Sequence, residues 1–402
     1  MNLWRRLFLP FAAGYFFSYF LRNVNAVIAP DLLRELGIAA SDLGLLTSVY
    51  LLAFGLAQLP LGMALDHFGA RRVESFLLLI AATGCALFAV STTLPQLALA
   101  RSVIGLGVSA CLMAAFKAFG QSFGPERQVS LNASIMAAGG LGALTASAPL
   151  AWLITQIGWR SVFFILAATG VVVAAGIFSV PEGENDNKSQ KAESFKTQWD
   201  GLRAIFFSRA FWQYAPPATL IIGGFMAFHG LWGIPWLMTF SGFSRAVAAH
   251  HMFLMGLGML IGFLTLAFGV APLAKRGISA DALLKTGLGL GQIVMALIIF
   301  ASRYQVSELL WFCLGLVFAV GNLVYALLQK NYPIELAGRA NTALNSMVFF
   351  GAFSIQWGFG AAVDACLSGG MAPATAYQVT LTGLLVLQAA SWLWLVSAKP
   401  IQ

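Results

Sequence analysis

The amino-acid sequence predicts an all-α, polytopic membrane protein with 12 transmembrane helices in two pseudo-symmetric six-helix bundles. Hydrophobic residues make up 59% of the 402 residues and charged residues only 9%, whereas soluble domains carry about 25% charged residues. Apolar runs of about 20 residues, long enough to cross a bilayer core as a helix, recur along the chain. One polar segment divides these runs into two sets of six. A water-soluble fold is therefore excluded.

The first set of apolar runs is bounded by charges, Gly/Pro clusters and turn residues. It predicts helices near residues 7–29, 43–65, 73–92, 96–122, 129–156 and 161–180. The chain begins with MNLWRR and an apolar run, as a signal peptide does, but the run continues through Arg22 and Asn25 without a cleavage site. We therefore expect a retained first helix.

The second set predicts helices near residues 209–240, 248–274, 280–301, 308–330, 339–363 and 375–397. Between the two sets lies PEGENDNKSQKAESFKTQWD, residues 181–200, whose polarity is typical of a linker. The predicted organisation is an N-terminal six-helix bundle at 1–180, a cytoplasmic linker at 181–208 and a C-terminal six-helix bundle at 209–402.

The net charge of +8 comes from basic residues in short loops between apolar runs, where they indicate topology rather than nucleic-acid binding. With the N-terminus inside, sixteen of the 23 Lys and Arg residues fall at inner loops and ends, and four at outer loops. We predict a multi-pass inner (plasma) membrane protein with both termini cytoplasmic. Metal-ligand spacing, a disulfide framework and cofactor motifs are absent from the sequence.

Three local motifs occur in order along the N-terminal half. The strongest comprises Gly62, Asp66, Gly69, Arg71 and Arg72, in GMALDHFGARR. Gly69 permits a tight turn, and Asp66 can face a helix N-terminus or pair with an arginine. An ordinary charged turn is the alternative interpretation. The other two motifs are Arg101, Gly105 and Gly107 in ARSVIGLGVSA, and Gly158, Trp159 and Arg160 followed by Phe163.

With the helix count and the central linker, these motifs resemble the major facilitator superfamily over the whole chain. The first is similar to its loop signature, G-x-x-x-D-(R/K)-x-G-x-R-(R/K), with His67 replacing a basic residue. The second resembles its fourth-helix pattern R-x-x-x-G-x-G, and the third its turn between helices 5 and 6. The resemblance implies a transporter that works by alternating access, with the loop motif as a latch between the halves and helices 1, 4, 7 and 10 lining the cavity.

Arg22 is the leading candidate for a substrate contact. YFLRNVNAVIAP in the first helix resembles that of organic-anion and nitrate-type porters, and Arg22 shares a helical face with Tyr15, Ser18, Tyr19 and Asn25. All fifteen acidic residues fall in loops or at the ends of predicted spans. A guanidinium without a carboxylate partner favours an anionic substrate. A structural arginine bonded to backbone carbonyls is the alternative.

The seventh helix contains FMAFHGLWGIPW, which places His229, Trp232 and Trp236 on one face. His229 is the histidine that lies well inside a span, so it is the candidate for proton coupling. A packed histidine bonded to a carbonyl is the alternative. The tryptophans are candidate cavity walls or interfacial anchors, and Gly233 and Pro235 loosen the helix.

Three further residues complete the candidate site. Arg101 lies near the outer end of the fourth helix, so it is a second-tier candidate that could instead snorkel or brace the bundle. Asn322 and Tyr325 in the tenth helix are candidate ligands through the family resemblance. Asn341 and Asn345 in the eleventh helix are expected to form interhelical hydrogen bonds.

The sequence therefore predicts a secondary active transporter that takes up a small anionic solute with H⁺, as a monomer in the lipid bilayer, without cofactor or metal. The alternative within transport is a polyspecific drug or metabolite exporter working as a proton antiporter, which commonly needs a carboxylate inside the membrane. A membrane enzyme would need a nucleophile and a base within reach of each other, and the spans offer no such pair. A receptor would need a signalling surface, for which the loops are short.

Overall fold

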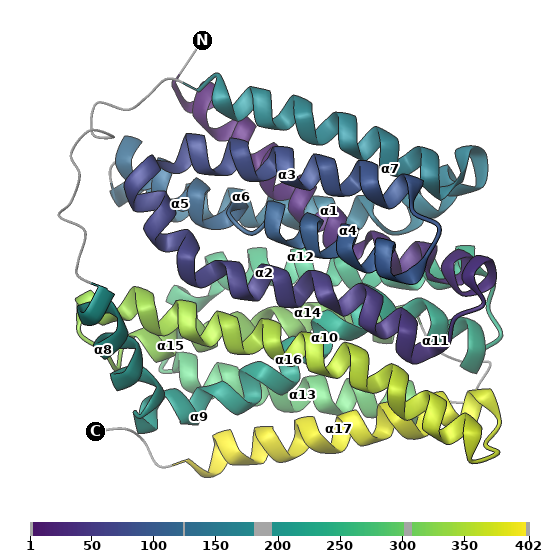
Figure 1. Cartoon of the computed structure of the whole chain (residues 1–402). Coiled ribbons are helices and arrows are strands. Elements are labelled where there is room, and N and C mark those ends of the chain that lie inside the picture. The colour runs from purple at the N-terminus through teal and green to yellow at the C-terminus, as the bar shows by residue number, and fades with distance from the viewer. Residues whose placement is uncertain (1–2, 124, 181–194, 301–307, 399–402) are drawn as a thin grey trace. The chain divides into compact units, whose positions relative to one another are not determined.

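The computed structural model describes residues 3–123, 125–180, 195–300 and 308–398, and every regular element in these ranges is a helix (Figure 1). The predicted all-α class is confirmed. The chain forms two compact units. Unit 1 comprises Met1–Gly37 and Val49–Ala192, and unit 2 comprises Ile38–Ser48 and Glu193–Gln402. The second helix therefore begins in unit 2 and continues in unit 1.

Unit 1 is a bundle in which α3 packs along α7 and α4, and α1 packs along α6 (Figure 1). The predicted fourth helix is two helices separated by residues 108–110, and one continuous element kinked at Gly158 joins parts of the predicted fifth and sixth helices. Its helices are α1 (Leu3–Leu36), α2 (Ala40–Phe68), α3 (Ala70–Val90), α4 (Leu94–Gly107), α5 (Cys111–Ser122), α6 (Pro125–Thr145) and α7 (Ala148–Phe178).

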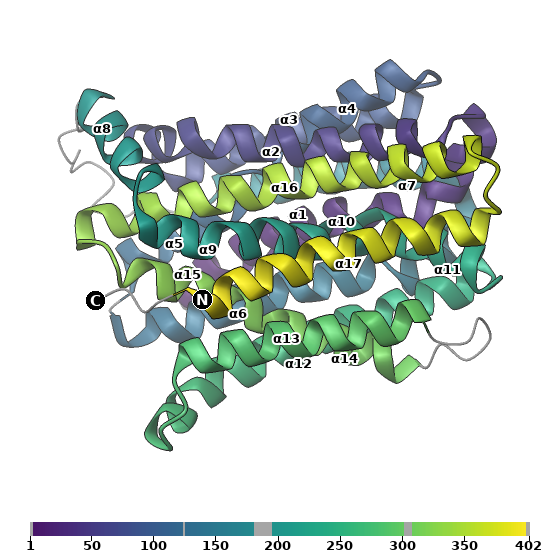
Figure 2. The same cartoon turned by 90° about the horizontal axis from the view of Figure 1, so that it is seen from below.

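Unit 2 contains the more interrupted helices, and α12, α13 and α14 lie side by side in it (Figure 2). Its elements are α8 (Phe195–Phe206), α9 (Arg209–Pro217), the π-helix η1 (Ala218–Ile222), α10 (Gly223–Ala227), the π-helix η2 (Phe228–Trp232), α11 (Gly233–Phe240), α12 (Arg245–Lys275), α13 (Ala280–Phe300), α14 (Glu308–Phe318), the 3₁₀ helix η3 (Ala319–Asn322), α15 (Leu323–Gln329), α16 (Ile334–Ser368) and α17 (Pro373–Ser397).

Part of the predicted linker is helical. Residues 181–194 lie outside the described residues, but α8 occupies the end of the segment and buries Ile205 in the core of unit 2. The division into 1–180, 181–208 and 209–402 stays a prediction.

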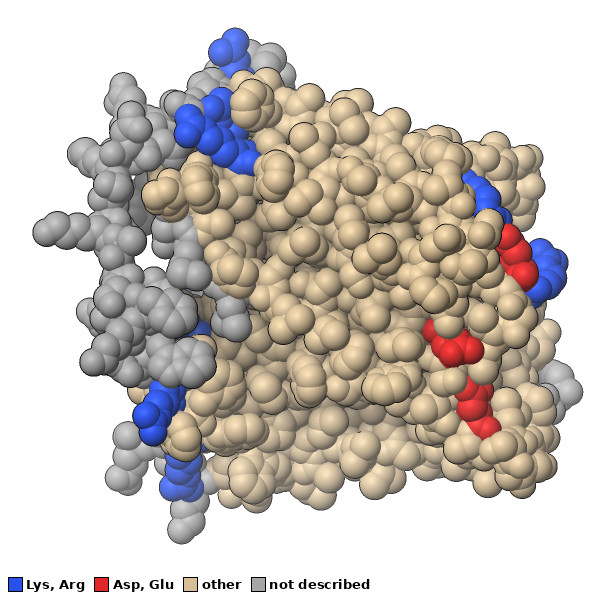
Figure 3. All heavy atoms as spheres, viewed as in Figure 1, with Lys and Arg blue, Asp and Glu red and all other residues tan. Residues whose placement is uncertain are grey.

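Ten helices of the described ranges are long and apolar enough to cross a membrane. These ten correspond to ten of the twelve predicted spans. The first and the fifth predicted spans are not among them, although both are helical: the first lies in α1, and the fifth lies in α6 and the start of α7. Charged side chains of described residues lie near the helix ends on the face seen in Figure 3, and the surface between them is uncharged. The chain is a multi-pass membrane protein, and the count of twelve spans stays a prediction.

The helix interruptions expose backbone carbonyls that neighbouring side chains then bond. At the break between α4 and α5, Ser18 donates to the carbonyl of Val108 at 3.4 Å and Gln58 donates to that of Ser109 at 3.1 Å. In η1, the Leu220 carbonyl accepts from Gln388 at 3.0 Å. Buried backbone groups in hydrocarbon must find such partners because water is absent. Specific polar side chains therefore make these breaks possible.

Proline explains the irregular course of α9 to α11. Pro216 and Pro217 precede η1, and Pro235 follows η2 by three residues. A proline has no N–H to give to the carbonyl one turn earlier, and π-type turns commonly accommodate such a gap. The loosened backbone expected near Gly233 and Pro235 is therefore present as a π-helix.

Close approach of α4 to α2 depends on Gly105. A Cβ on Gly105 would lie 2.3 Å from the carbonyl oxygen of Tyr50, which belongs to rigid backbone. Small residues at membrane helix contacts allow such packing. This contact gives a physical reason for the small residue in the R-x-x-x-G-x-G motif.

We predict that Gly105→Ala lowers the melting temperature of the purified protein in detergent. The added methyl group must displace α4 from α2, and overpacking of this kind costs about 1–3 kcal/mol. Gly176→Ala in α7 is the matched control, because nothing lies within 4 Å of its Cβ position. Equal melting temperatures for the two variants would contradict this account of the motif.

Candidate functional site

The Arg22 guanidinium of α1 lies on aromatic rings inside unit 1. Its Cζ is 4.5 Å from the centroid of the Tyr19 ring and 5.2 Å from that of Phe54 in α2. The Tyr50 hydroxyl also interacts with it. The side chain is half-buried. Ring faces attract a cation without using its in-plane N–H groups, so this setting stabilises the charge inside the bundle.

Arg101 of α4 is fully buried, with 0% exposure. Its Nη1 donates to the Leu21 carbonyl at 3.0 Å, and its Cζ lies 4.5 Å from the Tyr50 ring centroid. No salt bridge joins it to a carboxylate among the residues that the structure describes. Of the two roles left open by the sequence, bracing of the bundle agrees with this burial, whereas snorkelling does not.

Tyr50 connects the two arginines, and sequence reasoning missed it. It is fully buried, contacts both guanidinium groups and donates from its hydroxyl to the Ser18 carbonyl at 3.4 Å. The available signal was a single tyrosine in the middle of the apolar second helix. A phenol inside a span needs a partner, and this requirement points to a polar neighbour.

On the polar face of α1, some side chains are buried against other helices and others are partly exposed. Tyr19 is half-buried like Arg22, whereas Tyr15, Ser18 and Asn25 are buried. The Tyr15 hydroxyl donates to Met136 Sδ of α6 at 3.6 Å. Among the predicted ligands in this helix, Tyr19 and Arg22 are therefore the more accessible in this conformation, and Asn25 is enclosed.

One acidic residue at a predicted span end is enclosed by the protein. Glu74 lies in the second turn of α3 and has 0% exposure. It lies near the beginning of the helix, where the sequence alone suggested an interfacial position. Packing of α3 against α1, α4, α5 and α7 covers it instead.

In unit 2, His229 belongs to the π-helix η2 and is buried. Its ring stacks on Phe225 with centroids 5.7 Å apart and an interplanar angle of 5°, and it hydrogen-bonds with the backbone of Met252. These contacts are those of the packed histidine that the sequence left as an alternative. Its role in proton coupling stays a prediction.

Trp232 and Trp236 lie in the interior of unit 2. Trp232 donates from Nε1 to the Gln356 carbonyl at 2.8 Å and stacks on Phe359. Trp236 packs against Phe240 and Trp311. Both indoles are almost completely buried, so they are enclosed by unit 2 in this conformation rather than placed at an interface with lipid headgroups.

Asn322 and Tyr325 are half-buried where α14, η3 and α15 meet. Tyr325 donates from its hydroxyl to Asn345 Oδ1 of α16 at 3.0 Å, and Asn322 donates to the Ala319 carbonyl at 3.3 Å. Asn345 therefore forms the interhelical hydrogen bond expected from the sequence. The two candidate ligands lie in a segment with irregular backbone, and such segments within spans commonly line cavities.

The loop motif forms a tight turn between α2 and α3. Gly69 has φ 80°, a left-handed conformation that glycine adopts without steric cost. Arg71 donates to the carbonyls of Phe178 and Val180 at 3.1 and 3.2 Å, which joins α3 to the end of α7. Gly62 lies in α2 and Arg72 is exposed; the side chain of Asp66 is outside the description. The latch role of the motif stays a prediction.

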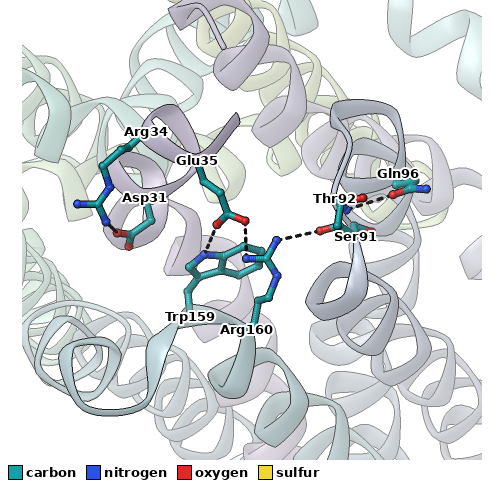
Figure 4. A network of polar contacts seen from close by, with 8 residues as sticks. All are labelled: Asp31, Arg34, Glu35, Ser91, Thr92, Gln96, Trp159 and Arg160. Carbon is teal, nitrogen blue, oxygen red and sulfur yellow. Dashed lines mark hydrogen bonds and ion pairs between the residues drawn. The ribbon is translucent and has the colours of Figure 1, made fainter. Parts of the chain in front are cut away.

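The third motif supports a polar network at the opposite end of unit 1 (Figure 4). Arg160 forms a 2.6 Å ion pair with Glu35 and donates to the Ser91 carbonyl at 3.2 Å. Trp159 donates to the second oxygen of Glu35 at 3.1 Å. The Arg160 guanidinium also lies 4.1 Å from the Trp159 ring centroid. The network ties the end of α1 to the end of α3 and to α7.

The helical spans and the buried cationic groups define a multi-pass membrane protein with charged sites in its interior. The chain belongs to the Major Facilitator Superfamily, because the sequence model of that family matches residues 11–356. The resemblance found in the sequence is confirmed.

Two curated relatives are carriers of sugar acids by name. A probable L-galactonate transporter of Escherichia coli (strain K12) is 24% identical over 294 residues, which cover 70% of this chain and 62% of that protein. A hexuronate transporter of the same organism is 27% identical over 162 residues, 40% of this chain and 37% of that protein. The chain thus matches less than two thirds of the length of these relatives.

Solved structures show the same fold. The crystal structure of a D-xylose-proton symporter superposes with a TM-score of 0.79 at 14% sequence identity, covering 99% of this chain and 98% of that one. The chain therefore shares the fold of this solved structure.

We predict that Arg160→Gln lowers the free energy of unfolding by about 1 kcal/mol, because it removes charge-assisted hydrogen bonds at the junction of three helices, where solvent screens them in part. Arg34→Gln is the matched control: its side chain is 83% exposed and its partner Asp31 is on the same helix, so a change within about 0.5 kcal/mol is expected. Denaturation in mixed micelles measures both values. Similar losses for the two variants would show that the network does not stabilise unit 1.

Proposed function

We propose that this protein is a secondary active transporter that takes up a small organic anion, of the sugar-acid class, across the inner membrane. It works by alternating access, and the anion enters together with H⁺. In this proposal it works as a monomer, with both termini in the cytoplasm. Arg22 binds the carboxylate of the substrate. Tyr19 and Asn25 from unit 1, and Trp232, Trp236, Asn322 and Tyr325 from unit 2, contribute the remaining contacts, some of them in other conformations of the cycle.

The position of Arg22 is the observation that carries the proposal. Its guanidinium is half-buried and stacked on the Tyr19 ring. Stacking uses the face of the guanidinium, whereas a carboxylate binds bidentately at its edge, so the two interactions are compatible. Charge complementarity in an environment of low dielectric favours an anion over a neutral sugar.

The names of the relatives support the substrate class. L-galactonate and hexuronates are hydroxylated monocarboxylates, which combine one anionic group with several hydroxyl groups. Such a solute needs one cation and several neutral hydrogen-bonding groups. In the proposal, Arg22 provides the cation, and the side chains of Tyr19, Asn25, Asn322 and Tyr325 provide neutral groups.

We predict that Arg22→Gln abolishes uptake of labelled D-glucuronate into proteoliposomes, because the substrate carboxylate loses its countercharge. The loss of binding should be at least about 100-fold, as expected for a truncated partner of a buried charge pair. Arg34→Gln, an exposed arginine of the same helix, is the control and should retain uptake. Uptake by Arg22→Gln at the wild-type rate would exclude Arg22 as the anchor.

The same preparation tests the solute class directly. A thermal-shift screen should show stabilisation by L-galactonate or D-glucuronate and none by neutral D-xylose, and stabilisation should disappear in Arg22→Gln. Stabilisation restricted to lipophilic neutral or cationic compounds would overturn the anion proposal.

A proton-driven exporter of such lipophilic compounds is the second candidate function. Glu74 favours it, because exporters of this kind commonly need a carboxylate inside the membrane and the sequence alone had suggested that none was present. The screen above separates the two candidates.

The hypothesis that His229 carries the coupled proton predicts that His229→Gln abolishes accumulation driven by a pH gradient while counterflow exchange continues. Exchange needs substrate binding and conformational change but no net proton movement, so it serves as the internal control. Accumulation with unchanged pH dependence would leave His229 with a packing role only.

A further inference from the structure

A carboxyl group is enclosed in unit 1 with a neutral thiol as its polar neighbour. Glu74 of α3 has 0% exposure, and among the described residues the Cys111 thiol is the hydrogen-bond partner of its carboxyl group. Oε1 lies against the backbone of α1, 2.4 Å from the position that a Cβ on Gly14 would take. The absence of a side chain at Gly14 thus makes room for the carboxyl group.

The surroundings of Glu74 contain no countercharge within the part of the chain that is described. From α5, the thiol of Cys111 faces it, and from α7 the apolar Ile177 approaches the same place on α1. From α1, Tyr15 follows Gly14 but bonds Met136. On α4, Arg101 bonds the Leu21 carbonyl, and on α3 itself Arg71 bonds carbonyls at the end of α7.

An ionised carboxylate in such a place would cost several kcal/mol, since it is closed to bulk solvent and meets a neutral thiol but no cation and no N–H donor among the described residues. A neutral carboxyl group avoids this cost. We propose that Glu74 is a proton-binding site of unit 1: it is protonated in the enclosed conformation described here, and it releases the proton in a conformation of the cycle that admits water to the contact between α1 and α3.

The site is connected to the substrate anchor by a short chain of side chains. Tyr15 follows Gly14 in the sequence, and the centroid of its ring lies 4.9 Å from that of the Tyr19 ring. The Cζ atom of Arg22 lies 4.5 Å from the Tyr19 ring centroid. Gly14 and Arg22 are separated by eight residues of helix, or roughly 12 Å. At an effective dielectric constant of about 20, a negative charge at that distance weakens anion binding about tenfold.

Proton binding and anion binding therefore favour each other. The protonated, neutral Glu74 leaves the field at Arg22 favourable for an anion, and the ionised form opposes it. Positive linkage of this kind is what symport of H⁺ with an anion needs. This coupling rests on the proposed function, whereas protonation of Glu74 does not.

The first experiment tests protonation without transport. Infrared difference spectra of purified protein, recorded between acidic and alkaline pH, should contain the carbonyl stretch of a protonated carboxylic acid, and Glu74→Gln should remove that band. Glu308→Gln is the control, since this side chain is 61% exposed. If Glu74→Gln does not fold, Glu74→Asp should shift the band. A band unchanged by substitution of Glu74 would overturn the proposal whatever the substrate is.

The second experiment tests coupling. D-glucuronate should bind wild-type protein about tenfold more tightly at acidic than at alkaline pH, and Glu74→Gln should bind at all pH values with the acidic affinity. In proteoliposomes this variant should exchange D-glucuronate but not accumulate it under a pH gradient. Accumulation at the wild-type level would exclude Glu74 as a coupling site. If the protein binds no anion but the infrared band is lost, the proposed function fails and the proton site stands.

Discussion

Backbone and side-chain polar groups inside the spans must be bonded within the protein, because hydrocarbon offers them no water. The break between α4 and α5 and the π-helix η1 are each accompanied by such a bond. Gln58 bonds the carbonyl of Ser109, and Gln388 bonds that of Leu220. The same requirement acts on charge, because Arg101 bonds the Leu21 carbonyl and shares the Tyr50 ring with Arg22. The candidate site of unit 1 lies where both the interrupted backbone and the arginine side chains need polar partners.

The break between α4 and α5 shows how local structure and site depend on each other. Gly105 and Gly107 bring α4 against α2 and α3, where a Cβ would meet backbone atoms of Tyr50 and Ala81. The helix then ends, and α5 begins at Cys111, beside Glu74. A regular helix over these residues would place Cys111 differently relative to α3. The glycine motif therefore has a consequence for the interior of unit 1, beyond the packing of a single pair of helices.

The two units use different means to hold polar residues. Unit 1 concentrates ionisable groups, with Arg22, Arg101 and Glu74 in its interior. The candidate polar side chains of unit 2 are mainly neutral: His229 in a π-helix, indole N–H groups, and the pair Tyr325 and Asn345. In the proposed cycle, unit 1 supplies the electrostatic attraction for anion and proton. Unit 2 supplies neutral contacts on helices whose irregular backbone can change conformation with little loss of hydrogen bonding.

Length, apolarity and motif spacing determined the fold class, the family and the polar face of α1 from sequence alone, because a bilayer imposes a strong pattern on composition and on span length. Only the tertiary structure decided that Glu74 is enclosed, that Tyr50 joins two arginines and that Arg101 is buried against the Leu21 carbonyl. Whether a residue near the end of a span meets water or protein depends on the neighbouring helices that cover it. Helical periodicity describes one helix at a time and carries no information about those neighbours.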